Sequence, residues 1–230
     1  MADCGHDDCP PDHCHRVARR PGHPEWVEAV RRQDRERPQH QPLSEYDAQT
    51  CRGLYGFVLD DQVKAGYHHQ LSGPAQLGQQ VVSTWLEAAR THTPVQLRAL
   101  VRRLQLVPAV GRAAPDQVLG DDDLTYLQLL LPFSGDVFAT LTIGMMVDGT
   151  GFGASGLWCE WGYLIDLDRD CVTVFRGLQT EPHFCGPWGA APQKGGCYGI
   201  RPVAEATFDE LEDQGWALME HRLARAEPPQ

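Results

Sequence analysis

Residues Leu157–Gly177 have the sequence LWCEWGYLIDLDRDCVTVFRG. Two runs rich in aromatic and β-branched residues, Trp158–Leu167 and Cys171–Phe175, flank a polar segment at 168–170. Such runs favour strands, and a short polar segment between two of them is typical of a turn. We therefore expect an antiparallel hairpin at this point of the chain.

A second hairpin is expected nearer the N-terminus, in CRGLYGFVLDDQVKAGYHH at residues 51–69. Its strands are predicted at Gly53–Leu59 and Val63–His69, with the turn at Asp60-Asp61. The segment LSGPAQLG at 71–78 breaks the strand pattern and precedes apolar residues at helical spacing.

Several helices are predicted between and after the hairpins. The first carries its apolar residues at Leu77, Val81, Val82, Trp85, Leu86 and Ala89. The second begins at Thr93-Pro94 and buries Leu97, Leu100, Val101 and Leu104, while Arg98, Arg102 and Arg103 form a solvated face. Residues 121–131 are expected to be helical, and 136–147 are left open between helix and strand. A last strand near Tyr198–Ala204 and a helix from Phe208 to Ala224, weakened by Gly215, complete the set.

The predicted fold is therefore α+β, with antiparallel hairpins at both ends of one domain and helices between them. We place this domain at residues 47–230. Residues 1–46 differ, because they hold six prolines, many charges and few aliphatic residues. Apart from a short helix expected at Pro24–Arg35, this Cys/His-rich tail has too little apolar surface to order itself.

The two hairpin sequences resemble a family of uncharacterised bacterial and phage proteins, over about residues 50–212. The family has a Thr-Arg-Gly opening before an apolar strand, a Tyr-Asn-His-x-Asp-Ser-Tyr-Pro segment, and a Glu-Trp/Tyr-Ala-Tyr-x-Ile-Asp-Leu-Asp hairpin. This chain departs from the family pattern at Cys51, His68, Leu71 and Gly73. The resemblance favours helix for 136–147 and implies no activity.

Composition and charge restrict the partners. The net charge is −11, and residues 111–230 alone carry 7 basic and 18 acidic residues. A duplex nucleic-acid binder usually has a basic footprint, so we expect no duplex partner. The sequence has no apolar run long enough for a membrane helix and no signal peptide at its N-terminus, so we expect a cytoplasmic protein with reduced thiols.

The tail MADCGHDDCPPDHCH at residues 1–15 is a candidate zinc site. Zinc takes four thiolate or imidazole ligands, and Cys4, Cys9 and Cys14 with His6 could supply them. His13 or His15 could replace His6. The alternative is a tail that picks up metal without folding around it, because all the ligands lie close together with no element between them.

Other motifs in the chain carry less chemistry. Cys159 and Cys171 lie on the two arms of one hairpin and could face each other, and His183, Cys185 and Cys197 follow. We interpret these thiols as small buried apolar side chains. Cys185–Trp188 lacks the second cysteine of a redox motif, GFGASG at 151–156 precedes a strand, and DLDRD at 166–170 lacks the glycine and glutamate of a calcium loop.

One enzyme hypothesis concerns Cys51 and Arg52, which open the first strand. N-terminal-nucleophile amide hydrolases place a cysteine in this way, and activation would require cleavage between Thr50 and Cys51. His69 and Ser72 could line the same site. About five strands are too few for the two-sheet core of that fold.

The sequence thus favours a non-enzymatic interaction or accessory protein with a protein partner and a zinc-binding tail. The alternative is a cysteine-dependent amide hydrolase that uses Cys51.

Overall fold

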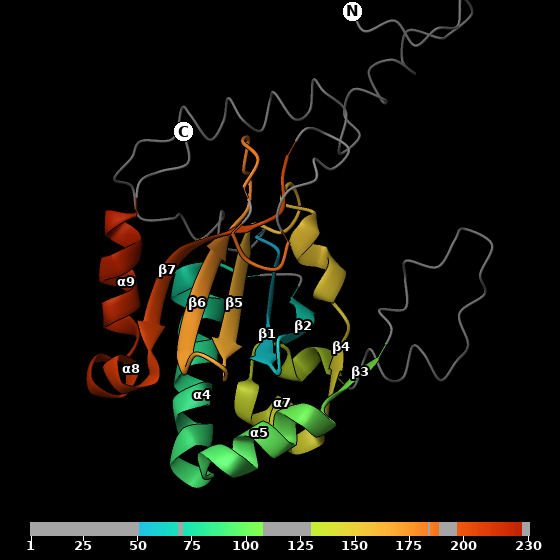
Figure 1. The fold of residues 1–230 in the computed structure, drawn as a ribbon, viewed down its shortest axis with the longest axis vertical. Coiled ribbons are helices and arrows are strands. Elements are labelled where there is room, and N and C mark those ends of the chain that lie inside the picture. Colours follow the sequence, from blue (N-terminus) through green and yellow to red (C-terminus); the bar gives the residue numbers. More distant parts are fainter. Residues whose placement is uncertain (1–50, 69–70, 108–129, 184, 189–196, 227–230) are drawn as a thin grey trace, which may run out of the picture.

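The two predicted hairpins lie side by side in one sheet. The computed structural model describes residues 51–68, 71–107, 130–183, 185–188 and 197–226 (Figure 1). Its strands are β1 (Gly53–Leu59), β2 (Gln62–His68), β5 (Trp161–Asp166), β6 (Cys171–Arg176) and β7 (Arg201–Thr207), in the order β2-β1-β5-β6-β7. The β1–β5 pair is parallel and the other pairs are antiparallel. The predicted α+β class is confirmed.

The helices of the described part are α4 (Gln79–Thr91), α5 (Pro94–Arg103), α7 (Val137–Ile143), α8 (Phe208–Gln214) and α9 (Trp216–Arg225), with short helical turns at Pro74–Gly78, Leu131–Phe133 and Thr150–Ala154. α5 begins where the sequence predicts, because Thr93 and Gln96 form a capping box and Pro94 occupies the first turn.

The two faces of the sheet are covered differently. One face packs against the helices through a large apolar cluster centred on Phe57, Trp85 and Tyr163. The other face packs against irregular segments through Leu54, Phe152, Phe175, Trp188 and Ile200. In Figure 1, α4 lies behind the sheet and α8 and α9 flank the β7 edge.

The segment 136–147 contains both a helix and a strand. Asp136 caps α7 by accepting a hydrogen bond from the backbone of Ala139, and Gly144 ends the helix in the left-handed conformation (φ 76°). The chain then forms β4 (Met145–Val147), which pairs in parallel with β3 (Gln105–Val107). Helix and strand are therefore each correct for part of the segment: most of it is the helix α7, and its last three residues form the strand β4.

Three other expectations need correction. The strand expected from Trp158 begins at Trp161, because Trp158 and Cys159 donate their backbone amides to Ser155 in a turn. The last strand is Arg201–Thr207, three residues later than expected. The C-terminal helix is interrupted, since Gly215 takes φ 60° and ψ −151° and separates α8 from α9.

Several predictions fall outside the described residues: the tail 1–46 with its helix at 24–35, and the helix expected at 121–131 up to residue 129. Within the described ranges, no helix is long and apolar enough to span a membrane.

Candidate functional site

A row of paired residues marks one end of the sheet. His68, Gly53, Trp161, Arg176 and Arg201 are register partners across all five strands. We call this end of the sheet the arginine end. Arg176 and Arg201 belong to the row, and Arg52 directly precedes Gly53, which also belongs to it. The opposite end, which we call the turn end, carries the hairpin turns at Asp60-Asp61 and 168–170. The site predicted around Cys51 lies at the arginine end.

Cys51 is buried just before β1. Its exposed fraction is 5%, and its Sγ donates a hydrogen bond to Oε2 of Glu160 at 3.3 Å. Its carbonyl accepts a hydrogen bond from the backbone N of Ser72 at 3.3 Å. The structure therefore places a carboxylate beside the predicted nucleophile, together with Ser72, which the sequence also suggested. His69 lies outside the described residues.

Ser72 is fully buried and connects neighbouring elements. Its Oγ donates to the carbonyl of His68 at 3.3 Å, and its carbonyl accepts from the hydroxyl of Tyr163 at 3.0 Å. Gly53 makes this close packing possible, because a Cβ there would lie 2.7 Å from the Cβ of Ser72 and 2.5 Å from the carbonyl oxygen of Trp161. Burial raises the pKa of the Tyr163 phenol well above its ordinary value, and the nearby Cys51 and Cys159 thiols add to this effect. Tyr163 therefore stays protonated and serves as a hydrogen-bond donor.

Leu71, the residue before Ser72, has a strained backbone. Its φ is +54°, a left-handed value that leucine rarely adopts, and 40% of the residue is exposed. Leu178 also has a left-handed φ of +59°, and it follows β6 at the same end of the sheet. Unlike Leu71, Leu178 packs against the buried Leu157 and Cys197. Strained residues of this kind concentrate at functional sites.

Two arginines at this end stack on tryptophan rings. The guanidinium carbon of Arg52 lies 5.1 Å from the ring centroid of Trp158, and that of Arg176 lies 5.0 Å from the centroid of Trp161. Arg52 is exposed and Arg176 is half-buried. Stacking of this kind holds a guanidinium group in place while its N–H edge stays available for a carboxylate or phosphate.

The other predicted thiols do not form a site in the described structure. Cys159 and Cys171 cannot face each other, because Cys171 pairs with Asp166 at the turn end and Cys159 precedes Trp161 at the arginine end. Burial raises the pKa of the Cys171 thiol to about 11. Cys197 is buried and Cys185 is exposed. Among the residues that the structure describes, no three His, Cys, Asp or Glu side chains are arranged to hold a metal. The tail residues Cys4, His6, Cys9 and Cys14 lie outside those residues.

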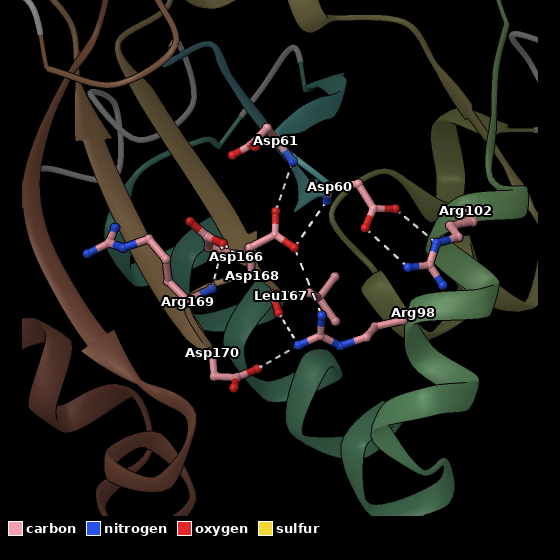
Figure 2. Close-up of polar contacts among 9 residues, drawn as sticks. All are labelled: Asp60, Asp61, Arg98, Arg102, Asp166, Leu167, Asp168, Arg169 and Asp170. Atoms are coloured by element: carbon pink, nitrogen blue, oxygen red, sulfur yellow. Dashed lines mark hydrogen bonds and ion pairs between the residues drawn. The ribbon is translucent and has the colours of Figure 1, made fainter.

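The turn end contains a polar network that ties the two hairpins together (Figure 2). The carboxylate of Asp168 accepts the backbone amides of Asp60 and Asp61 at 3.1 and 3.0 Å. Arg98 and Arg102, expected on a solvated face, keep 33% and 55% of their side chains exposed and also reach from α5 into this network: Arg98 to Asp168, Asp170 and the carbonyl of Leu167, and Arg102 to Asp60. The hydrogen bond from Arg102 lowers the pKa of the Asp60 carboxyl.

These carboxylates therefore bind backbone amides and arginines, which is a structural role. Asp166 likewise accepts the backbone amides of Asp168 and Arg169, both at 3.0 Å.

Sequence reasoning missed Glu160, Leu71 as a strained residue, and the arginine row. The alignment of Arg52, Arg176 and Arg201 depends on the parallel pairing of β1 with β5, which joins segments about 100 residues apart. The only available signal was that Arg176 directly follows the predicted strand Cys171–Phe175 and that Arg201 lies within the strand predicted near Tyr198–Ala204. In comparisons with protein-family models, curated proteins and solved structures, no match to this chain was found.

Proposed function

We propose that this chain is a non-enzymatic binding protein whose contact surface is the arginine end of the sheet. The observation that carries the proposal is Leu71, which combines a strained backbone with an exposed apolar side chain. A left-handed conformation costs a non-glycine residue about 1–2 kcal/mol. 40% of Leu71 remains exposed, so packing inside the chain uses only part of its side chain. Contact with a partner would use the side chain that this conformation holds at the surface.

The proposed partner is a protein. Leu71 supplies an apolar contact, and Arg52 lies close to it because the backbone N of Ser72 donates to the carbonyl of Cys51. Arginine and large apolar side chains together are typical of the energetically important part of an interface. We also propose a cytoplasmic location, which the reduced thiols at Cys159, Cys171, Cys185 and Cys197 support.

The test compares two exposed apolar residues. Leu71→Gly removes the leucine side chain and relieves the backbone strain, so we expect loss of partner capture together with a higher melting temperature. Val95→Ala is the matched control, because Val95 is 77% exposed on α5, which contacts the turn end. Tagged wild type and both variants are used to purify partners, and bound proteins are quantified by mass spectrometry.

A protein retained by wild type and by Val95→Ala, and lost from Leu71→Gly, is the expected result. If no protein shows this pattern, or if Leu71→Gly retains every protein that wild type binds, the proposal is wrong.

The second candidate is the amide hydrolase, which the Cys51–Glu160 contact favours. A carboxylate that accepts the thiol hydrogen at 3.3 Å is a geometry in which Glu160 could act as a base. Two observations argue against it: Cys51 is only 5% exposed, and the described strands form a single five-stranded sheet with a separate two-stranded one.

A further inference from the structure

Two arginines lie directly opposite each other on neighbouring strands. Arg176 at the end of β6 is the register partner of Arg201 at the start of β7. Side chains at such positions point to the same face of the sheet with Cβ atoms roughly 5 Å apart, and like charges there destabilise the fold. The charges of this pair therefore do not contribute to folding stability.

In the described part of the chain, these arginines form no ion pair with an acidic side chain. The ion pairs found there involve Arg98, Arg102, Arg169 and Arg222, and none involves Arg52, Arg176 or Arg201. Two acids lie near the arginine end or on β7, but both have other partners. Glu205 pairs with Arg169 at 2.8 Å, and Glu160 accepts the neutral Cys51 thiol and keeps its charge, so that three arginines and this one carboxylate leave the arginine end net positive.

The three arginines occupy one end of a chain that is otherwise strongly acidic. The net charge of the chain is −11. The row across β1, β5, β6 and β7 nevertheless contains Arg176 and Arg201, and Arg52 is the residue before its member Gly53. A local positive patch on an acidic protein attracts an anionic group while the remaining surface repels extended polyanions.

We propose that the arginine end binds a short acidic segment of a protein partner, through the guanidinium groups of Arg176 and Arg201 on one face of the sheet and of Arg52 on the other face at the same end, where it stacks on Trp158. This inference rests on the proposed function and specifies its partner. The stacked arginines Arg52 and Arg176 would present fixed N–H edges to Asp or Glu carboxylates. Arg201 is exposed. A further carboxylate of the partner would neutralise it and relieve the repulsion between Arg201 and Arg176. Three arginines are a small footprint for a nucleic acid, which favours a peptide.

The experiment measures binding of a fluorescein-labelled hexaglutamate peptide to the full chain by fluorescence anisotropy. We expect wild type to bind, with affinity falling as salt is raised. The double variant Arg176→Gln/Arg201→Gln should weaken binding at least about tenfold, equivalent to about 1.4 kcal/mol. Arg103→Gln is the matched control, because Arg103 is an exposed arginine on α5, and it should bind like wild type.

A second readout separates this role from a structural one. Arg201→Glu should raise the melting temperature, because it places a carboxylate opposite Arg176, and it should abolish hexaglutamate binding. A variant that was merely misfolded would lose stability and binding together.

The inference is overturned if wild type does not bind hexaglutamate, if the double variant and Arg103→Gln bind equally, or if a single-stranded oligonucleotide of equal charge binds more tightly than the peptide. Any of these outcomes leaves the proposed function to be judged by Leu71→Gly. If partner capture depends on Leu71 while none of the arginine variants affects it, the binding protein stands and its acidic partner does not.

Discussion

Cys51 is the residue on which the choice between a binding protein and an enzyme depends. Its thiol is buried and bound to Glu160, and its carbonyl is held by Ser72. These contacts explain Cys51 as a packed residue that continues the sheet toward the arginine end. These contacts would have to break before the Cys51 thiol could react with a substrate.

For Cys51→Ala we expect a full-length chain, as in wild type, with the two intact masses differing only by the lost sulfur, and unchanged partner capture. The variant should lose about 1 kcal/mol of stability, since it leaves the Glu160 carboxylate without the thiol and creates a small cavity. Intact-mass spectrometry and urea unfolding of wild type and variant check this. A wild-type chain that begins at Cys51, with uncleaved chain in the variant, would establish the hydrolase instead.

Element boundaries show where local sequence signals were sufficient. Thr93-Pro94 predicted the start of α5, and Asp60-Asp61 predicted the first hairpin turn, where both residues adopt left-handed φ values of 53° and 57°. These features depend on neighbouring residues alone, as capping boxes and tight hairpin turns do.

Other features could not be predicted because they depend on contacts distant in sequence. The pairing of β1 with β5 decides which residues share the arginine end, and nothing within either strand specifies that partner. The split of 136–147 into α7 and β4 depends on β3, which lies about 40 residues earlier. The candidate site was therefore predictable at Cys51, Arg52 and Ser72, but not at Glu160 or Arg201.

The break between α8 and α9 gives a prediction that opposes helix propensity. Alanine is the better helix former, but Gly215 has φ 60° and ψ −151°, a combination that is essentially restricted to glycine. Gly215→Ala should therefore destabilise the chain by about 1–3 kcal/mol, measured by urea unfolding. Stabilisation would mean that α8 and α9 form one continuous helix.

The Asp168 network predicts how the two hairpins depend on each other. Asp168→Ala removes the acceptor of two backbone amides and a partner of Arg98. We expect a loss of about 1–3 kcal/mol in the free energy of unfolding, because each of the two exposed hydrogen bonds contributes roughly 0.5–1.5 kcal/mol. The control Asp61→Asn retains the left-handed turn, since asparagine tolerates this conformation, and should change little. Equal effects of the two variants would contradict this account of Asp168.

The tail and the domain of the whole molecule are proposed to bind different partners: zinc for the tail and a protein for the domain. We predict about one zinc ion per chain, bound mainly by the thiols of Cys4, Cys9 and Cys14. Elemental analysis should show this zinc in wild type and in Cys185→Ser/Cys197→Ser, and not in a variant with serine at positions 4, 9 and 14. Equal zinc in all three proteins would place the metal elsewhere.

The sheet as a whole has two chemically different ends. At the turn end, Arg98 and Arg102 are paired with aspartates and stabilise the hairpins. At the arginine end, Arg176 and Arg201 face each other without an acidic partner in the described part of the chain. We propose that the chain keeps this second arrangement for binding, at the expense of stability.

The most direct test of this claim is a double-mutant cycle on Arg176 and Arg201, followed by urea unfolding. Because Arg176 also packs on Trp161, a single variant mixes lost packing with relieved repulsion, and the cycle isolates the interaction between the two arginines. We predict a repulsive coupling of about 0.2–1 kcal/mol that shrinks as salt is raised. A coupling that is zero or attractive would contradict this proposal, because the two arginines would then not destabilise the fold.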